Sequence, residues 1–260
     1  MRVAVTRDVS PAVARCELTH LERVPIDVVA ARLQHRAYEA CLASLGCTVE
    51  RLPSAPELPD SVFVEDAAVV LDEVAVIARP GAPSRRLEVP AVAAALEQYR
   101  PVVRVEAPAT LDGGDVLRVG RELLVGRSGR TNAAGIAQLR GMLGAYGYSV
   151  REVRVHGCLH LKSAVTAVAD DLLLANRRWL SADDLPALDV LDVHPEEPFG
   201  ANALRIGDAI VYAAELPRTR ERLEARGLRV HTVPAGELAK AEGGVTCCSL
   251  VFDAPQRAKA

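Results

Sequence analysis

The chain has 260 residues, of which half are hydrophobic and a quarter are charged, so it is long enough to bury a large core. Its net charge of −3 excludes the broad basic surface that nucleic acid or an anionic membrane would require. No apolar run approaches the roughly 18 residues that span a bilayer, which excludes a membrane-embedded class.

The first ten residues carry charge at Arg2, Arg7 and Asp8, where a secretory signal would need an uninterrupted apolar stretch. We therefore expect a cytoplasmic protein with neither nucleic acid nor a membrane as a partner. The six cysteines are too few and too scattered for a disulfide scaffold. We expect reduced thiols that mostly pack as small hydrophobic groups.

One sequence pattern recurs along the chain: a polar residue, an apolar strand, a charged or glycine-containing turn, and a second apolar strand. The chain begins with a predicted strand at residues 2–7 and a long helical run. The recurring pattern then predicts β-hairpins over residues 64–81, 111–129, 159–177 and 201–217, and a last single strand near 243–252. The helical stretches, each followed by an extended segment, are expected over residues 25–46, 84–99, 130–147, 176–188 and 217–227. The repeating unit is therefore ββαβ.

The polar residues at the starts of the copies recur about every 45 residues, at Asp66, Asp112, His160, Asn202 and Cys247. The fifth copy lacks its second strand, which residues 2–7 would supply, so that the chain closes on itself. We predict an α/β fold, a five-fold pseudosymmetric α/β propeller of ββαβ units, formed as one domain by residues 1–260. In such a ring the copy starts converge on one central site. The spacing alone also fits an open α/β sheet.

The segment GGVTCCSL places Cys247 and Cys248 side by side at the predicted centre. If the segment is extended, adjacent side chains point to opposite faces, so only one thiol can face the site. Gly243 and Gly244 allow a close backbone approach just before the first cysteine, which favours Cys247 as the active thiol. Burial of both thiols in the core is the alternative.

A thiol nucleophile needs a proton partner, and His160 is the histidine that lies in a strand-like apolar segment at the start of a copy. Acids in apolar surroundings, where an unpaired charge is costly, lie in VFVEDAAV and TLDGGDV, at Glu65, Asp66, Asp112 and Asp115. An Asx-Gly turn or a strand edge is the structural alternative for these acids. Cysteine, histidine and an orienting acid follow the logic of covalent catalysis, and the surplus acids indicate a compact cationic substrate such as a guanidinium.

Six motifs follow one another along almost the whole chain: FVED (63–66), RPGAPSRR (79–86), TLDGGDVL (110–117), GRELLVGRSGRTN (120–132), LHLKS (159–163) and VTCCS (245–249). Together they resemble the dimethylarginine dimethylaminohydrolases, a family of the guanidine-modifying (pentein) superfamily with five-fold α/β propeller folds. The resemblance implies hydrolysis of N-omega-methylated arginines, both mono- and asymmetric dimethylarginine, to citrulline and methylamine or dimethylamine. The reaction would pass through a covalent cysteine thiouronium, without a cofactor and without a metal.

The resemblance also implies roles for individual residues. Cys247 would be the nucleophile, His160 the general acid and base, and Asp112 the acid that orients His160. The substrate contacts would be Leu18, Asp60, Glu65, Asp66, Arg85, Arg130 and Ala241. Among these, Asp66 would hold the guanidinium, Arg85 and Arg130 the substrate carboxylate, and the backbone oxygens near Leu18 and Ala241 the α-amino group.

Other functions are compatible with the same residues. An arginine deiminase or an amidinotransferase of the superfamily would act on unmethylated guanidines, and a propeller that has lost its chemistry would be a binding module. A thiolate and an imidazole in one pocket can also bind zinc, which we would expect to inhibit. The expected partner is a small methylated arginine. The oligomeric state is left open, with a homodimer as one option.

Overall fold

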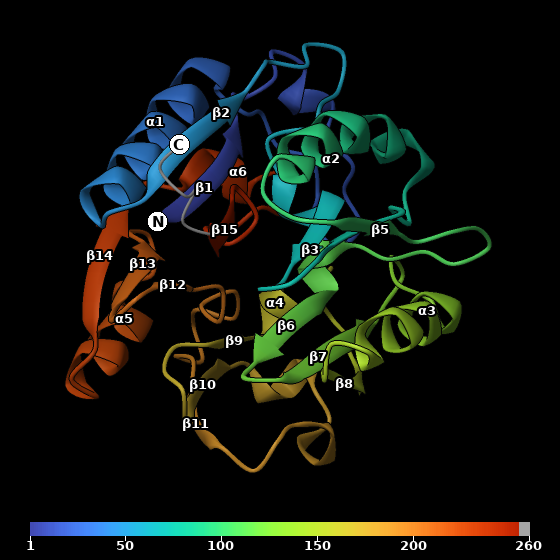
Figure 1. Cartoon of the computed structure of the whole chain (residues 1–260). Helices are drawn as coiled ribbons and strands as arrows, with labels where there is room; N and C mark the ends of the chain where they lie inside the picture. Colours follow the sequence, from blue (N-terminus) through green and yellow to red (C-terminus); the bar gives the residue numbers. More distant parts are fainter. Residues whose placement is uncertain (255–260) are drawn as a thin grey trace.

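The computed structural model describes residues 1–254, apart from the side chain of Ala182. Within this part the chain forms five three-stranded sheets arranged around a common axis (Figure 1). In every sheet the central strand runs antiparallel to one neighbour and parallel to the other. This arrangement confirms the predicted five-fold α/β propeller.

Four units follow the order of the chain. The first two contain β3 (Ala68–Val70), β4 (Ala75–Ile77), α2 (Val89–Glu97) and β5 (Val102–Arg104), then β6 (Val116–Val119), β7 (Glu122–Arg127), α3 (Ala133–Gly144) and β8 (Ser149–Arg154). The next two contain β9 (Val165–Ala167), β10 (Leu172–Ala175) and β11 (Asp189–Asp192), then β12 (Leu204–Ile206), β13 (Ala209–Ala213), α5 (Pro217–Ala225) and β14 (Arg229–Val233). Short helical turns lie at η1 (Val13–Arg15), η2 (Val64–Ala67), η3 (Pro83–Glu88), η4 (Gly113–Asp115), α4 (Leu161–Ala164), η5 (Arg177–Trp179), η6 (Ala182–Asp184) and α6 (Gly236–Ala239).

The fifth unit is built from both ends of the described chain. Strand β15 (Leu250–Asp253) pairs antiparallel with β1 (Arg2–Arg7), with Val3 opposite Phe252. Helix α1 (Val28–Ser44) and strand β2 (Thr48–Leu52) complete the unit, and β2 runs parallel to β1. The predicted closure of the ring by residues 2–7 is therefore confirmed. The assignment of residues 1–260 to one domain stays a prediction, and its last six residues lie outside the described part.

The long helices begin where polar side chains cap them. The Asp27 carboxylate accepts the Ala30 N–H at the start of α1, and the Asn132 side chain accepts the Gly135 N–H at the start of α3. These caps satisfy backbone donors that have no partner in the first turn of a helix. Helix α3 ends at Gly144, three residues before the predicted stop at Gly147, whose φ of +76° lies in the turn that follows the helix.

The helix predicted over residues 176–188 is present only as the two short 3-10 turns η5 and η6. Between the two turns, Leu180 is extended and forms an antiparallel bridge with Val155. The side chain of Asn176 also accepts the N–H of Arg178, which holds the chain in a tight turn. Pro186 then lacks the N–H that a continuing helix would need. Tertiary pairing therefore overrides the helical pattern in this unit.

The first strand of each sheet lines one cavity of about 540 Å³ on the axis of the ring. Its walls include residues of β3, β6, β9, β12 and β15. Just before each of these strands the chain makes a turn, and the five turns meet around the axis. The copy starts that are far apart in the sequence thus come together, as the repeat predicts.

The turn before β15 departs from the prediction of an extended VTCC segment. Residues 245–248 form a turn, in which the Cys247 N–H donates to the Gly244 carbonyl at 3.2 Å, and the strand begins only at Leu250. Alternation along a strand therefore does not separate the two thiols. The turn itself separates them, because Cys247 reaches a cavity while Cys248 is buried in a hydrophobic cluster.

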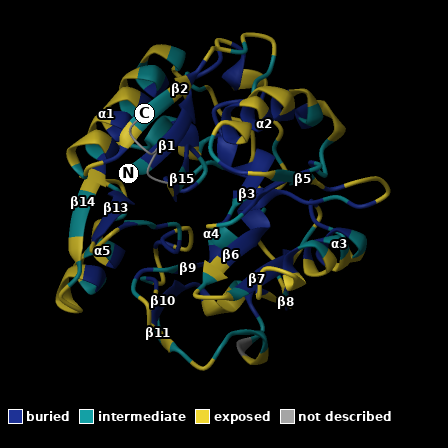
Figure 2. Cartoon of the chain, viewed as in Figure 1, coloured by how far each residue is buried: buried dark blue, intermediate teal, exposed yellow. Residues whose placement is uncertain are grey.

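Figure 2 shows the strands around the axis as buried, whereas the outward surfaces of α1, α2, α3 and α5 carry the exposed residues. The buried side chains are mainly alanine, valine and leucine, because the chain has few aromatic residues. All six cysteines lie in the described part and are free thiols, as predicted. Within residues 1–254, no helix has both the length and the apolar character needed to cross a membrane.

We expect Gly113→Ala to destabilise the fold, because an added Cβ would lie 2.0 Å from the backbone oxygen of Glu65 in the neighbouring turn. Backbone atoms cannot yield as a flexible side chain can, so we expect a loss of about 2–3 kcal/mol in the free energy of unfolding. Gly141→Ala is the control, because its Cβ in α3 would meet nothing within 4 Å. This control should raise stability by up to about 1 kcal/mol. Urea unfolding of both variants measures the effects, and equal stabilities would contradict the close packing of the two turns.

Candidate active site

A small cavity beside the central turns is lined by most of the predicted site residues. Its free volume is about 10 Å³, which is room for about one water molecule. Seven of the ten predicted residues line it, contributed by four of the five units and by the chain just before β3: Asp60, Asp66, Arg85, Arg130, His160, Ala241 and Cys247. The fold therefore gathers a thiol, an imidazole, acids and two guanidinium groups within one cavity.

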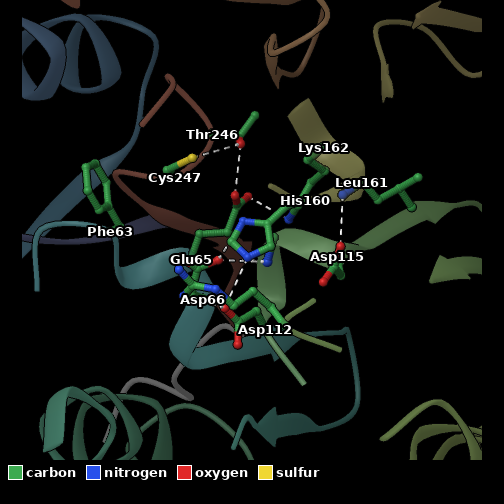
Figure 3. A network of polar contacts seen from close by, with 12 residues as sticks. Phe63, Glu65, Asp66, Asp112, Asp115, His160, Leu161, Lys162, Thr246 and Cys247 are labelled. Atoms are coloured by element: carbon green, nitrogen blue, oxygen red, sulfur yellow. Dashed lines mark hydrogen bonds and ion pairs between the residues drawn. The ribbon is translucent and has the colours of Figure 1, made fainter. Parts of the chain in front are cut away.

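His160 lies between two buried carboxylates at the centre of this cavity (Figure 3). Its Nε2 is 3.0 Å from Oδ2 of Asp112, and its Nδ1 is 3.7 Å from Oδ1 of Asp66. Burial alone would lower the pKa of His160, but the charges of Asp66 and Asp112 outweigh it and raise the pKa to about 9. The imidazole is therefore protonated at neutral pH and can donate a proton.

Asp112 is held rigidly by the chain around it. It is fully buried, its Oδ1 accepts the Gly81 N–H at 2.8 Å, and its own N–H donates to Oγ1 of Thr131 at 3.1 Å. With one oxygen fixed by the backbone, the other is directed at His160. This is the geometry of an acid that orients a histidine.

Asp66 is held by a backbone donor and by a buried arginine. Its Oδ1 accepts the Gly114 N–H at 3.0 Å, and its Oδ2 is ion-paired with Arg85. Burial would raise the pKa of Asp66, but the charges of His160 and Arg85 lower it to about 2. Asp66 therefore stays an anion at any pH at which the protein would work.

The two predicted arginines are in different states. The Arg85 guanidinium is buried and already donates to Asp66, to Glu88 and to two backbone oxygens just before η2. Arg130 donates to the Thr19 hydroxyl at 3.3 Å through Nη2, whereas its buried Nη1 has no hydrogen-bond partner. Nη1 also lies 3.8 Å from Asp112. Arg130 thus has the freer donor in the cavity.

Cys247 is the partly exposed member of the cysteine pair. Its Sγ accepts the Gly244 N–H at 3.3 Å. Burial, followed by the charges of Glu65 and Asp66, raises the pKa of Cys247 to about 12, so that the thiol is neutral in the empty site. Burial also raises the pKa of Cys248 well above its ordinary value, and Cys248 does not line the cavity.

Neighbouring residues of two turns face different cavities. Asp66 and Cys247 line the catalytic cavity, whereas Glu65 and Thr246 line the axial cavity. Glu65 is ion-paired with Lys162 at 2.6 Å and accepts the Thr246 hydroxyl at 2.9 Å (Figure 3). Burial raises the pKa of Glu65 although the charge of Lys162 opposes it. The Glu65 carboxylate is therefore already paired with Lys162 and Thr246 at the axial cavity.

Two predicted substrate contacts, Leu18 and Glu65, do not line the catalytic cavity. Leu18 packs against the hydrophobic cluster that contains Cys248, while its neighbour Glu17 lines the cavity instead. Asp115, the fourth acid of the apolar segments, is fully buried outside the cavity and accepts the Leu161 N–H at 2.9 Å. Burial raises the pKa of Asp115 to about 6.

Comparison with known proteins places the chain in a family. A dimethylarginine dimethylaminohydrolase of Streptomyces coelicolor is 42% identical over 249 residues, which cover 95% of this chain and 95% of that protein. The chain belongs to the dimethylarginine dimethylaminohydrolase family. A dimethylarginine dimethylaminohydrolase of Pseudomonas aeruginosa is 36% identical over 228 residues, which cover 87% of this chain and 90% of that protein. No family model matches the chain.

The fold agrees with this assignment to the dimethylarginine dimethylaminohydrolase family. A crystal structure of the Pseudomonas aeruginosa enzyme, a cysteine-to-serine mutant complexed with citrulline, superimposes with a TM-score of 0.90 at 32% sequence identity. The superposition covers 96% of this chain and 98% of that one. The five-unit ring is thus the fold of a solved member of the family.

Five residues without a predicted site role also line the cavity: Glu17, Phe63, Leu159, Glu242 and Gly243. Phe63 and Leu159 lie in the motifs FVED and LHLKS, and Gly243 is one of the two glycines expected to allow a close backbone approach. An added Cβ at Gly243 would meet the Phe63 ring at 2.3 Å. Glu17 and Glu242 come from polar loop segments. Nothing in their sequence context distinguishes them from solvated surface acids.

Three side chains of the site are close enough together to hold a metal ion. Ligand atoms of Asp66, Asp112 and His160 lie within 4.8 Å of one another. Asp66 is already paired with Arg85, however, and Arg130 lies beside Asp112. Two guanidinium charges next to the carboxylates oppose the binding of a divalent cation there.

The state of the empty site can be checked with a neutral alkylating reagent. Because the pKa of Cys247 is raised, we expect its alkylation by iodoacetamide to keep accelerating as the pH rises beyond 9, without a plateau near neutral pH. At pH 7 the rate should be at least about tenfold below that of free cysteine. Peptide mass spectrometry, with Cys247→Ser as the background, locates the label. A plateau below pH 7 would instead indicate a thiolate paired with imidazolium in the empty site.

Proposed function

We propose that this protein hydrolyses N-omega-methylated arginines, both mono- and asymmetric dimethylarginine, to citrulline and methylamine or dimethylamine. The observation that carries the proposal is the one small cavity that Cys247, His160, Asp66 and Arg130 line together. The family membership and the citrulline complex of the Pseudomonas aeruginosa enzyme support it. The cytoplasmic location predicted from the sequence belongs to the same proposal.

The charges of the cavity match both ends of a methylated arginine. Asp66 would hold the guanidinium, because its carboxylate stays ionised and is fixed by Gly114 and Arg85. Arg130 would bind the substrate carboxylate through Nη1, which has no hydrogen-bond partner. Arg85 would mainly fix Asp66, and its positive charge would also attract the substrate carboxylate. The backbone near Leu18 and Ala241 would accept the α-amino group. Asp60, whose carboxylate accepts the Glu17 N–H, would support that region.

Substrate binding would activate the nucleophile. In the empty site the carboxylates keep the Cys247 thiol neutral, and a bound guanidinium cancels their charge and favours the thiolate. The thiol proton leaves to solvent. The sulfur then attacks the central guanidinium carbon, forming a C–S bond and a tetrahedral adduct.

His160 would transfer protons in both halves of the reaction. As an imidazolium it protonates the leaving nitrogen, the C–N bond breaks, and methylamine or dimethylamine departs from a thiouronium on Cys247. The neutral imidazole then accepts a proton from water, whose oxygen attacks the same carbon. Breaking of the C–S bond releases citrulline and regenerates the thiolate.

The proposal is tested by incubating the protein with asymmetric dimethylarginine and, in parallel, with arginine. We expect citrulline and dimethylamine in equal amounts from the first substrate and little ammonia from the second. Cys247→Ser should lower turnover by at least about a thousandfold, since it removes the nucleophile. Cys248→Ser is the matched control and should retain turnover within about threefold, because Cys248 fills the core. Ammonia from arginine as the main product would make the protein an arginine deiminase instead.

A second substitution tests the orienting acid. In Asp112→Asn the hydrogen bond to Gly81 can remain, but the charge that raises the pKa of His160 is lost. The pKa of His160 should fall, so less imidazolium is available and the alkaline limb of the pH–kcat/KM profile should move to lower pH. We expect activity at pH 8 to drop by about a hundredfold. Asp208→Asn, at an exposed ion pair, serves as the control. An unshifted alkaline limb would remove Asp112 from this role.

A further inference from the structure

One carboxylate binds three consecutive backbone N–H groups of a distant segment. The Glu242 side chain accepts the N–H of Thr19 at 3.1 Å, that of Leu21 at 2.7 Å, and that of His20 between them. The acceptor lies more than 220 residues away in the sequence. An anion surrounded by successive N–H groups is a strong, charge-assisted arrangement.

The backbone of Glu242 is strained. Its φ is +59°, and among residues 1–254 it is the only residue other than glycine with a positive φ. A side chain with a Cβ rarely adopts this conformation, whereas glycine does so without cost. A glutamate at a position that favours glycine indicates that the side chain itself is needed there.

Glu242 lines the cavity, and the segment that it binds contributes Glu17 to the same cavity. Residues 16–27 contain no helix or strand, so the segment is held by side chains and not by a sheet. Two further attachments come from cavity residues, since Asp60 accepts the Glu17 N–H and Arg130 donates to the Thr19 hydroxyl. Glu242 itself lines the cavity beside Ala241.

The cavity cannot admit a substrate in this state, because its free volume holds about one water molecule. A wall must therefore move, and Glu17 is the wall residue that belongs to the long segment without helix or strand, residues 16–27. A separate, mainly apolar cavity of about 210 Å³ lies behind Leu21 and Glu242. The segment thus has room to move without first displacing core side chains.

We propose that Glu242 is a positioning residue that latches residues 19–21 over the substrate. It acts through the segment, by fixing the backbone of Leu18 and the hydroxyl of Thr19 next to the amino-acid end of the substrate, and does not touch the reacting carbon. The proposal rests on the proposed function for its substrate. The latch itself is a property of the free protein and is measured separately.

Glu242→Gly is the decisive variant, because it removes the carboxylate and at the same time relieves the strained backbone. Three measurements are made: hydrogen–deuterium exchange of the amides of residues 19–21, KM and kcat for asymmetric dimethylarginine, and thermal unfolding. We expect exchange and KM each to rise by about tenfold or more, with a smaller change in kcat and little or no loss of thermal stability. Glu242→Gln, which keeps one acceptor oxygen, should be intermediate in exchange and in KM.

Glu197→Gln is the matched control. The Glu197 carboxylate also accepts two consecutive backbone N–H groups, of Arg218 and Thr219, but it lies away from the catalytic cavity. This variant should lose thermal stability while KM and the exchange of residues 19–21 stay unchanged.

Unchanged exchange in Glu242→Gly would overturn the latch, and faster exchange with an unchanged KM would overturn its role in positioning. A fall in stability like that of Glu197→Gln, with kcat and KM affected together, would reduce Glu242 to a structural residue and also overturn the proposal. If the wild type does not hydrolyse dimethylarginine, the proposed function fails. The exchange measurement still decides whether the latch exists.

Discussion

Buried polar groups at the axis of this ring find their partners in other units, and the rest of the structure depends on these contacts. The acid of one turn, Glu65, is satisfied by Lys162 and by Thr246, which belong to two other units. The same holds for Asp112 with His160. A unit that folded alone would leave these charges unpaired in apolar surroundings, at a cost of several kcal/mol each. The ring therefore holds together at its polar centre as well as through its apolar walls, and the same contacts assemble the catalytic cavity.

The sequence predicts the ring well because its signal is repeated. Alternating apolar residues and turn signals recur five times, so a weak local pattern gains weight from its copies. The prediction fails where tertiary contacts decide a conformation. Leu180 is drawn into a bridge with Val155 and interrupts an expected helix, and the VTCC segment forms a turn instead of a strand. The bridge at Leu180 needs Val155. The VTCC turn is fixed by distant partners, since the Thr246 N–H donates to Asn202 and the Glu65 N–H donates to the Cys247 carbonyl. None of these contacts can be read from the local residue order.

In the candidate site, too, the repeat predicts which segments meet, whereas tertiary contacts decide how individual side chains point. Cysteine, histidine and acids at the starts of the copies point to the cavity, because convergence follows from the repeat. Which of two adjacent residues enters the cavity does not follow. Glu65 faces the axial cavity while Asp66 faces the proposed substrate cavity. The chain there is a 3-10 turn, and the direction of each side chain depends on how that turn is placed in the ring. Glu242 carries no sequence signal at all, because its left-handed backbone is a result of the fold.

The pairing of β15 with β1 joins the two ends of the described chain in one sheet. Cys247 lies in the turn that leads into β15, so the sulfur of the proposed nucleophile takes its place only once the last strand has paired with the first. During synthesis His160 and the acids are made well before Cys247, so the proposed site lacks its thiol until the last unit is added. In this arrangement, completion of the site is coupled to closure of the ring.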